Sequence, residues 1–251
     1  IFAGMRTKGR TFIKAKKSRN HTEILCKFLR LPIKVKTKKN FDFIEVNEVK
    51  KIKPLNYKIP SDISSAAFFI VLAALSKDSK IIIRKVNINP SRDGVIRILK
   101  KMGIKIHLKN KRIYKGEKIA DIFVKGSKYI KSINCPTQLN SNAIDEFLLI
   151  FLVAAKAKGV SNFRNISELN QKESKRLDWG AKILNKMGVK TTQTQDSIKI
   201  FGNPNLEVKK KIVIKDYLKD HRVFMTSVIA ALSFGGKWYI HDKNSINTSF
   251  P

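Results

Sequence analysis

The chain repeats one helix and strand pattern along its length, and this repeat limits the folds that it can adopt. A helix-sized apolar segment, a short turn and a β-rich segment occur four times, at residues 1–13, 70–83, 150–163 and 227–240. A small residue marks each turn, and these residues are spaced 70, 80 and 77 positions apart: Gly9, Ser79, Gly159 and Gly236. This period is too long for the common solenoid repeats, so it predicts a domain built of pseudo-equivalent α/β units.

A second helix and strand follow in most copies. The helix ends in K-M-G at residues 95–106 and 181–190, and a related segment at 25–35 has Pro32 in place of the glycine. Glycine after the last periodic residue ends a helix, because it adopts the left-handed conformation without steric cost. The first helix of each unit is apolar nearly all round, which predicts that these helices are buried and that the sheets lie outside them.

The segment from Phe41 to Tyr57 has no helical period and contains Pro54. It predicts strands that lead into a crossover between two lobes. We therefore expect a lobe boundary near Lys58.

The formal net charge of +33 invites a nucleic-acid hypothesis, because neutralising phosphates releases counterions. However, lysines are spread along the whole chain and greatly outnumber arginines, whereas phosphate recognition favours clustered arginine forks and aromatic stacking partners. We interpret the charge as a compositional bias without specific nucleic-acid binding. Either interpretation predicts attraction of small anionic ligands.

The sequence gives no support for several other classes of protein. The longest apolar run, residues 64–75, is shorter than the roughly 18 to 20 residues that span a bilayer, so no membrane association is expected. Cys26 and Cys135 are far apart, and the four histidines are scattered, which indicates neither a disulfide framework nor a metal-ligand cluster. Without a visible signal peptide, a cytoplasmic location is expected. Apolar patterning at Ile1 and Pro251 suggests a piece of a longer protein.

Polar clusters precede the predicted helices. Capping explains Asp62, Ser64 and Asn89, since such side chains satisfy free amides at helix starts. Capping does not explain why acids and cations gather at the same ends of repeated units: Asp145, Glu146, Lys172, Glu173, Arg176 and Arg222. Helix amino termini already favour anions, so one shared anion-binding cleft accounts for all of these residues.

An ordered set of motifs covers essentially the whole chain: D-I-S-S-A-A-F-F (62–69), N-P-S-R (89–92), A-I-D-E (143–146), K-E-S-K-R (172–176), D-H-R (220–222) and T-S-F-P (248–251). In this order they resemble the 5-enolpyruvylshikimate-3-phosphate synthase family of enolpyruvyl transferases. The resemblance implies an inside-out α/β prism of two lobes, each with three βαβαββ units around buried helices. Residues 1–57 would be the last unit of the N-terminal lobe, and residues 58–251 most of the C-terminal lobe.

The resemblance also implies a reaction. The enolpyruvyl group of phosphoenolpyruvate is transferred to the 5-hydroxyl of shikimate 3-phosphate and phosphate is released, a step of the shikimate pathway to aromatic amino acids. The family uses no metal and no organic cofactor. The expected partners are these two small anionic substrates, and we expect a monomer for the full-length protein.

Site residues follow from the resemblance, motif by motif. Asp145 matches the carboxylate that holds and deprotonates the 5-hydroxyl, and Glu173 matches a proton-transfer acid. The expected contacts with shikimate 3-phosphate come from Ser18, Arg19, Asp145, Glu168 and Lys172. The expected contacts with phosphoenolpyruvate come from Arg176, His221 and Arg222. Capping remains an alternative for Ser18, and a structural role remains one for His221 and His21.

The chain departs from the family pattern at Asn20, Asp93, Lys175 and Thr248, where relatives carry Asp, Thr, an acid and a phosphate-binding Lys. The family's K-S-x-x-x-R, N-A-G-T and S-x-Q segments would all precede Ile1, so we expect the chain alone to be inactive. Two alternatives stay open. One is the sister transferase acting on UDP-N-acetylglucosamine, whose loop cysteine has no counterpart context at Cys26 or Cys135. The other is a basic RNA-binding module.

Overall fold

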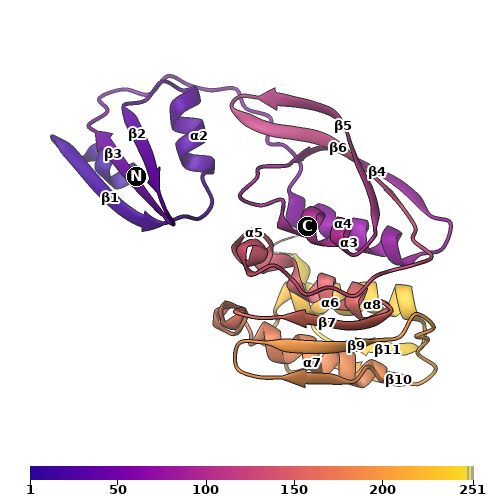
Figure 1. Ribbon diagram of the computed structural model, residues 1–251. Coiled ribbons are helices and arrows are strands. Elements are labelled where there is room, and N and C mark those ends of the chain that lie inside the picture. The colour runs from indigo at the N-terminus through magenta and orange to yellow at the C-terminus, as the bar shows by residue number, and fades with distance from the viewer. Residues whose placement is uncertain (248, 250–251) are drawn as a thin grey trace.

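The computed structural model describes residues 1–247 and 249, and these form a mixed α/β protein. Figure 1 shows a smaller N-terminal part, in indigo, beside a larger part in which helices lie between sheets. Within the described residues, none of the helices has both the length and the apolar character needed to cross a bilayer.

Three successive units repeat the same five elements: a helix, a strand, a second helix and two strands. The first unit comprises α1 (Phe2–Arg6), β1 (Arg10–Lys16), α2 (His21–Phe28), β2 (Ile33–Lys38) and β3 (Phe41–Asn47). The second comprises α3 (Ile63–Leu75), β4 (Lys80–Asn87), α4 (Gly94–Lys101), β5 (Lys105–Tyr114) and β6 (Glu117–Lys125). The third comprises α6 (Phe147–Ala155), β7 (Gly159–Phe163), α7 (Arg176–Met187), β8 (Thr191–Gln193) and β9 (Ile198–Gly202).

A fourth set of elements follows, and short helical turns link the units. The fourth set is β10 (Lys211–Ile214), α8 (His221–Phe234) and β11 (Lys237–Ile240). The linking turns are η1 (Thr137–Leu139), α5 (Asn140–Ala143), η2 (Ile144–Glu146), η3 (Ser167–Gln171) and η4 (Lys243–Ile246).

The sheets confirm the repeat. Their strand orders are β1-β3-β2, β4-β6-β5 and β7-β9-β8, so the last strand of each unit always pairs between the other two. The leading strand of the βαβαββ pattern is reduced to parallel bridges, such as Ser61 to Val86 and Asn134 to Asn162, but β10 pairs in parallel with β11 along four residues. Gly103 and Gly188 end α4 and α7 at φ values of 89° and 90°, as the two K-M-G segments predict.

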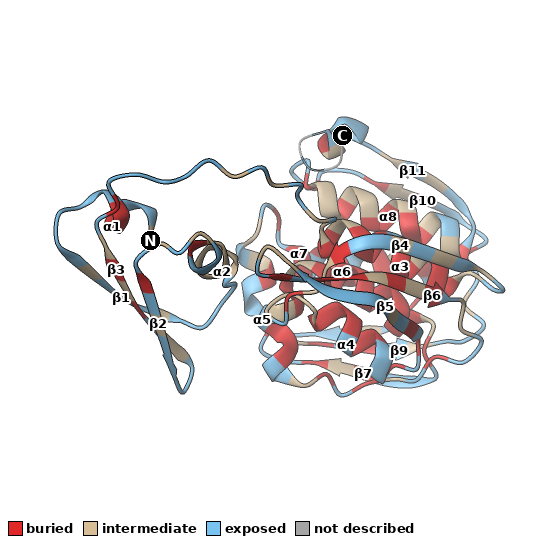
Figure 2. Cartoon of the chain, turned by 90° about the horizontal axis from the view of Figure 1, so that it is seen from above, coloured by how far each residue is buried: buried red, intermediate tan, exposed pale blue. Residues whose placement is uncertain are grey.

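The predicted burial of the first helices is confirmed most fully in the middle of the chain. All nine residues of α6 are buried, as are ten of the thirteen in α3. Figure 2 shows this red interior, with paler strands around it. Helix α8 is only half covered among the described residues, and its Leu232 is 65% exposed. Long apolar side chains on one stripe of α8 still join the common core, through Val223, Ile229 and Phe234.

Two separate apolar cores form. The larger one contains buried residues from Ile63 to Phe234, and the edge-to-face rings of Phe147, Phe151 and Phe163 lie in it. The smaller one holds six buried residues of the first unit and the segment that follows it: Met5, Cys26, Ile33, Ile44, Val46 and Val49. Between them, residues 48–60 have no regular secondary structure, so the expected strand character of 41–57 is correct only as far as Asn47. The proposed lobe boundary near Lys58 lies at the end of this segment.

The three predictions of helix caps have different outcomes. Asp62 caps α3, because its carboxylate accepts a hydrogen bond of 3.0 Å from the Ser65 amide. The prediction for Ser64 was wrong, because its buried hydroxyl donates to Glu146. Asn89 is not the N-cap of α4, which is Asp93, but its Oδ1 accepts from the Ser91 amide over 2.8 Å in the turn before that helix. Its amide nitrogen makes a tertiary contact instead, with Asn20 at the start of α2.

Candidate active site

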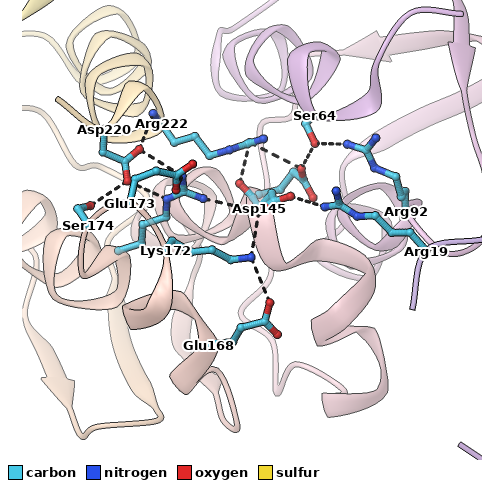
Figure 3. A network of polar contacts seen from close by, with 12 residues as sticks. Arg19, Ser64, Arg92, Asp145, Glu168, Lys172, Glu173, Ser174, Asp220 and Arg222 are labelled. Carbon is cyan, nitrogen blue, oxygen red and sulfur yellow. Dashed lines mark hydrogen bonds and ion pairs between the residues drawn. The ribbon is translucent and has the colours of Figure 1, made fainter. Parts of the chain in front are cut away.

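The carboxylate of Asp145 lies where four segments distant in sequence meet. It belongs to η2, which runs directly into the buried helix α6. Arg19 donates to its Oδ2, while Lys172 Nζ and Arg176 Nη1 each lie 3.6 Å from its Oδ1. Figure 3 shows Arg19 and Lys172 pointing toward Asp145 from different sides. The cations and acids that the sequence predicts at one shared site therefore meet at Asp145.

These neighbouring cations determine the charge state of Asp145. Burial raises its pKa, but Arg222, Arg19 and Lys172 together outweigh burial and hold the pKa below its ordinary value. Asp145 is consequently ionised near neutral pH. When anionic ligands occupy the same cations, the cations stabilise the carboxylate less, and its affinity for a proton increases.

Arg176 and Asp220 form a buried ion pair beside Asp145. Arg176 opens α7 and is 2% exposed, and its Nε donates to Asp220 Oδ2 over 2.9 Å. The hydroxyl of Ser174 donates to the same oxygen over 2.8 Å. Burial raises the pKa of Asp220, but the bond and charge of Arg176 outweigh burial and lower it. Arg176 also donates to Glu173, whose side chain is 56% exposed at the rim.

The start of α8 supplies Arg222 and His221. Asp220 is its N-cap and accepts from the Arg222 amide over 2.9 Å, which explains why D-H-R occurs at a helix start. The Arg222 guanidinium donates to the backbone oxygen of Asp145 over 2.9 Å, so Arg222 reaches the same centre from another helix. Burial, followed by the charge of Arg222, lowers the pKa of His221, and the imidazole is therefore neutral at pH 7.

A cavity of about 230 Å³ lies between the amino ends of α3 and α8. Its lining combines carboxylate, hydroxyl, imidazole and guanidinium groups with two apolar side chains: Asp62, Ser64, Ser65, Phe68, His221, Arg222, Met225 and Ser249. Two helix amino ends and a guanidinium favour a bound anion.

Behind Asp145 lies a second carboxyl group, that of Glu146, which is 3% exposed. It accepts from Ser64 Oγ over 2.5 Å and lies 3.8 Å from Arg222 Nη1. Arg92 in turn donates to Ser64 over 2.7 Å. Burial raises the pKa of Glu146, although Ser64 and Arg222 oppose the rise.

The expected site residues differ in how close to this centre they lie. Arg19, Lys172, Arg176 and Arg222 all reach Asp145, and Glu173 and His221 lie beside them. Glu168 is at the edge, 60% exposed on its side chain, and reaches the centre only through Lys172 at 3.1 Å. Ser18 is exposed next to Arg19. Helix α2 has Asn20 as its N-cap, so Ser18 does not cap it. Thr248 lies outside the described residues.

The sequence predicted no role at the site for Asp220, Ser174, Ser64 or Arg92. Their only sequence signal was membership of the D-H-R, K-E-S-K-R, D-I-S-S and N-P-S-R motifs. Among the described residues, no group of three or more His, Cys, Asp or Glu side chains is arranged to hold a metal ion.

The arrangement can bind anions and move protons. Four cations from three segments of the chain surround one ionised carboxylate, and a second acid lies at the rim. Such a site stabilises negative charge that develops on a substrate, because its dipoles and charges are already oriented.

Comparisons with known proteins match one family along the whole chain. The family model described as EPSP synthase (3-phosphoshikimate 1-carboxyvinyltransferase) matches residues 1–251. The 3-phosphoshikimate 1-carboxyvinyltransferase of Endomicrobium trichonymphae is 37% identical over 252 residues, covering 100% of this chain and 57% of the relative. That of Ruthia magnifica is 39% identical, with coverages of 100% and 56%.

Solved structures give the same result. EPSP synthase from Acinetobacter baumannii superposes with a TM-score of 0.88 at 37% identity, over 99% of this chain and 56% of that one. The enolpyruvyl transferase NikO from Streptomyces tendae shares the fold, with a TM-score of 0.69 at 12% identity over 98% of this chain and 54% of that one. The chain spans a little over half the length of the curated relatives it matches. By sequence and by fold, it belongs to the EPSP synthase family.

Proposed function

We propose that the full-length protein is a 3-phosphoshikimate 1-carboxyvinyltransferase, which transfers the enolpyruvyl group of phosphoenolpyruvate to the 5-hydroxyl of shikimate 3-phosphate. The observation that supports it most is the convergence of Arg19, Lys172, Arg176 and Arg222 on Asp145, in a chain of this family. Two substrates that are both anionic need several cations around one reacting centre.

The reaction needs two opposite proton transfers. The substrate hydroxyl loses its proton as its oxygen bonds to C2 of phosphoenolpyruvate, and the methylene carbon gains a proton, which gives a tetrahedral adduct. Elimination breaks the bond from C2 to the phosphate oxygen and removes a proton from the methyl group, so phosphate leaves and the enol ether remains. A carboxylate base and a second acid on the other side of the reacting carbon meet this need.

Asp145 is the proposed base for the 5-hydroxyl. Its pKa is low while Arg222, Arg19 and Lys172 are near, which makes it a weak base in the free site. Phosphate and carboxylate groups of the substrates would draw these cations toward themselves. Substrate binding would thereby raise the basicity of Asp145 at the moment when the hydroxyl is in place.

The remaining roles follow the positions of the side chains. Glu173 is the proposed proton-transfer acid, because it is exposed at the rim and held by Arg176. Ser18, Arg19, Lys172 and Glu168 are proposed to contact shikimate 3-phosphate. Arg176, Arg222 and neutral His221 are proposed to hold phosphoenolpyruvate, with guanidinium forks suited to its carboxylate and phosphate.

The proposal includes the organisation of the whole protein. We infer two lobes, with residues 1–57 in the N-terminal one and residues 58–251 in the C-terminal one, and substrates bound between them. A cytoplasmic monomer without a cofactor is the corresponding expectation.

The test is phosphate release by the purified full-length protein, with phosphoenolpyruvate and either shikimate 3-phosphate or UDP-N-acetylglucosamine as acceptor. Phosphate release with shikimate 3-phosphate but not with the nucleotide sugar as acceptor supports the proposal. Release with the nucleotide sugar but not with shikimate 3-phosphate refutes it. Asp145→Asn should lower turnover by about 10²-fold or more. The matched control is Asp216→Asn, because the Asp216 side chain is 80% exposed, forms an ion pair only with neighbouring Lys215, and has a φ of 62° that Asn tolerates.

A further inference from the structure

A polar cluster with two buried members joins the first unit to the rest of the chain. It consists of Asn20 and His21 at the start of α2, Asn89 after β4, and Glu117 at the start of β6, and we name it the α2–hairpin cluster. Glu117 Oε1 lies 2.5 Å from His21 Nδ1, and Asn89 Nδ2 donates to Glu117 Oε2 over 3.2 Å. The same amide nitrogen donates to Asn20 Oδ1 over 2.9 Å.

Water has little access to two members of the cluster, although Asn20 is exposed and the His21 side chain is 34% exposed. Asn89 is 1% exposed and Glu117 is 5% exposed. Each carboxylate oxygen of Glu117 therefore depends on a protein partner, one from each side of the junction. Removing a partner of a buried charge costs more than removing an exposed one, because water cannot replace the lost contact.

The backbone confirms how closely the two parts approach. Gly116, in the turn between β5 and β6, has a φ of 90°. A Cβ atom there would lie 2.9 Å from Ile24 Cγ2 and 3.5 Å from Phe28 Cβ, both on α2. Figures 1 and 2 both place α2 as the element of the first unit nearest to the larger part. The hairpin and α2 thus form a packed contact with a polar centre.

Asn20 and His21 immediately follow Ser18 and Arg19. Arg19 contributes a guanidinium to Asp145, although its own side chain is 46% exposed and receives little support from packing. The two residues that follow it, Asn20 and His21, are bonded to the buried side chains of Asn89 and Glu117. The contacts of the cluster join residues that are 68 to 96 positions apart, and Ser18 and Arg19 directly precede its first member.

We propose that Glu117, supported by Asn89, is a positioning residue: through His21 and Asn20 it holds the segment 18–21 at the edge of the cleft. This inference rests on the proposed function for its substrate, because Ser18 and Arg19 act on the phosphate of shikimate 3-phosphate. Glu117 itself does not touch the reacting atoms. Its loss therefore weakens the binding of one substrate and leaves that of the other.

The first measurement needs no catalysis. In the 251-residue chain, hydrogen exchange is compared between wild type, Glu117→Gln and the matched control Glu207→Gln, whose exposed side chain pairs only with Lys209 at 3.7 Å. Glu117→Gln should speed exchange of the α2 amides by about 10-fold and leave those of α6 unchanged, since the amide of glutamine keeps the shape but not the charge. Unchanged α2 exchange overturns the anchoring role.

The second measurement uses the full-length enzyme. Glu117→Gln should raise KM for shikimate 3-phosphate by about 10-fold, while kcat and KM for phosphoenolpyruvate change less than about twofold. An unchanged KM for shikimate 3-phosphate in an active enzyme overturns the proposal. If wild type itself shows no turnover, the proposed function fails, and the hydrogen-exchange result still decides whether Glu117 anchors α2.

A second variant covers the case in which Glu117→Gln disturbs folding, which faster exchange in α6 would reveal. His21→Gln removes the partner on the other side of the junction and leaves the hairpin intact. It should raise the same KM, and combining it with Glu117→Gln should add nothing, because both act through one contact. Fully additive effects would show that Glu117 does not act through His21.

Discussion

Replacing Asp220 by Ala should destabilise the chain more than any other single change at the site. Its carboxylate accepts from Arg176 Nε, Ser174 Oγ and the Arg222 amide, at 2.9, 2.8 and 2.9 Å. The Asp220 side chain is 0% exposed and that of Arg176 is 2% exposed. The substitution therefore removes a helix cap and leaves a buried guanidinium without its main partner.

The magnitude follows from these contacts. Breaking a buried ion pair costs about 3–5 kcal/mol, and losing a cap costs about 1 kcal/mol. The two losses share one carboxylate, so they do not simply add. Arg176 also keeps Asp145 at 3.6 Å and Glu173, which compensate in part. We expect a decrease of about 3 kcal/mol in the free energy of unfolding at pH 7.

The assay is urea unfolding of the 251-residue chain, followed by tryptophan fluorescence, to which Trp179 contributes one turn after Arg176. The control is Glu207→Ala, an exposed carboxylate whose loss should cost less than about 0.5 kcal/mol. A decrease below about 1 kcal/mol for Asp220→Ala would refute the reasoning. Adding Arg176→Met should restore part of the loss, because the charge left without a partner is then removed.

The destabilisation by Asp220→Ala should also depend on pH. The pKa of Asp220 in the folded chain is lower than the ordinary value of an aspartate, 3.8. A depressed pKa means that the contribution of Asp220 is present above the unfolded value and is lost as the pH falls through the folded one. The difference between wild type and Asp220→Ala should therefore shrink below pH 3.8.

Three further outcomes are expected. In the full-length enzyme, Glu173→Gln should lower turnover by about 10²-fold with little change in substrate binding, and near-normal turnover would exclude it as the proton-transfer acid. Arg176→Lys or Arg222→Lys should raise KM for phosphoenolpyruvate more than KM for shikimate 3-phosphate, because lysine cannot form two parallel bonds, and equal rises would indicate misfolding instead. Burial raises the pKa of Glu146, so its ionisation costs stability as the pH rises above the unfolded value near 4.5. The stability of Glu146→Gln relative to wild type, measured by urea unfolding, should therefore increase between pH 4.5 and 8, and a constant difference would contradict this.

Periodicity predicted most of the fold because the repeated elements are strongly patterned. Helices α3 and α6 are apolar on every side, and such helices have no alternative to burial. The K-M-G segments predicted two helix ends because glycine has a specific backbone role there. In contrast, the absence of a helical period predicted strand along all of 41–57, although only Phe41–Asn47 is a strand and residues 48–57 contain Pro54, which cannot donate to a strand ladder.

Prediction of the site was limited by long-range pairing. Asp145, Arg176 and Arg222 were found because their motifs carry both charge and order along the chain. Ser64 was misassigned as a cap because its true partner, Glu146, is 82 residues away, and spacing does not reveal such a contact. A single sequence identifies polar side chains that need a partner, but only the packed helices determine which partner each one receives.

The two cores differ greatly in size, so the two parts of the chain should differ in how readily they open. Six buried residues hold the first unit and the segment after it, whereas the larger core extends through α3, α4, α6, α7 and α8. The mostly exposed segment 48–60 between them offers lysines to a protease at positions 50, 51 and 58. Limited trypsin digestion should therefore cut there first, at a rate set by how often the first unit opens, and leave a resistant piece that begins after Lys58.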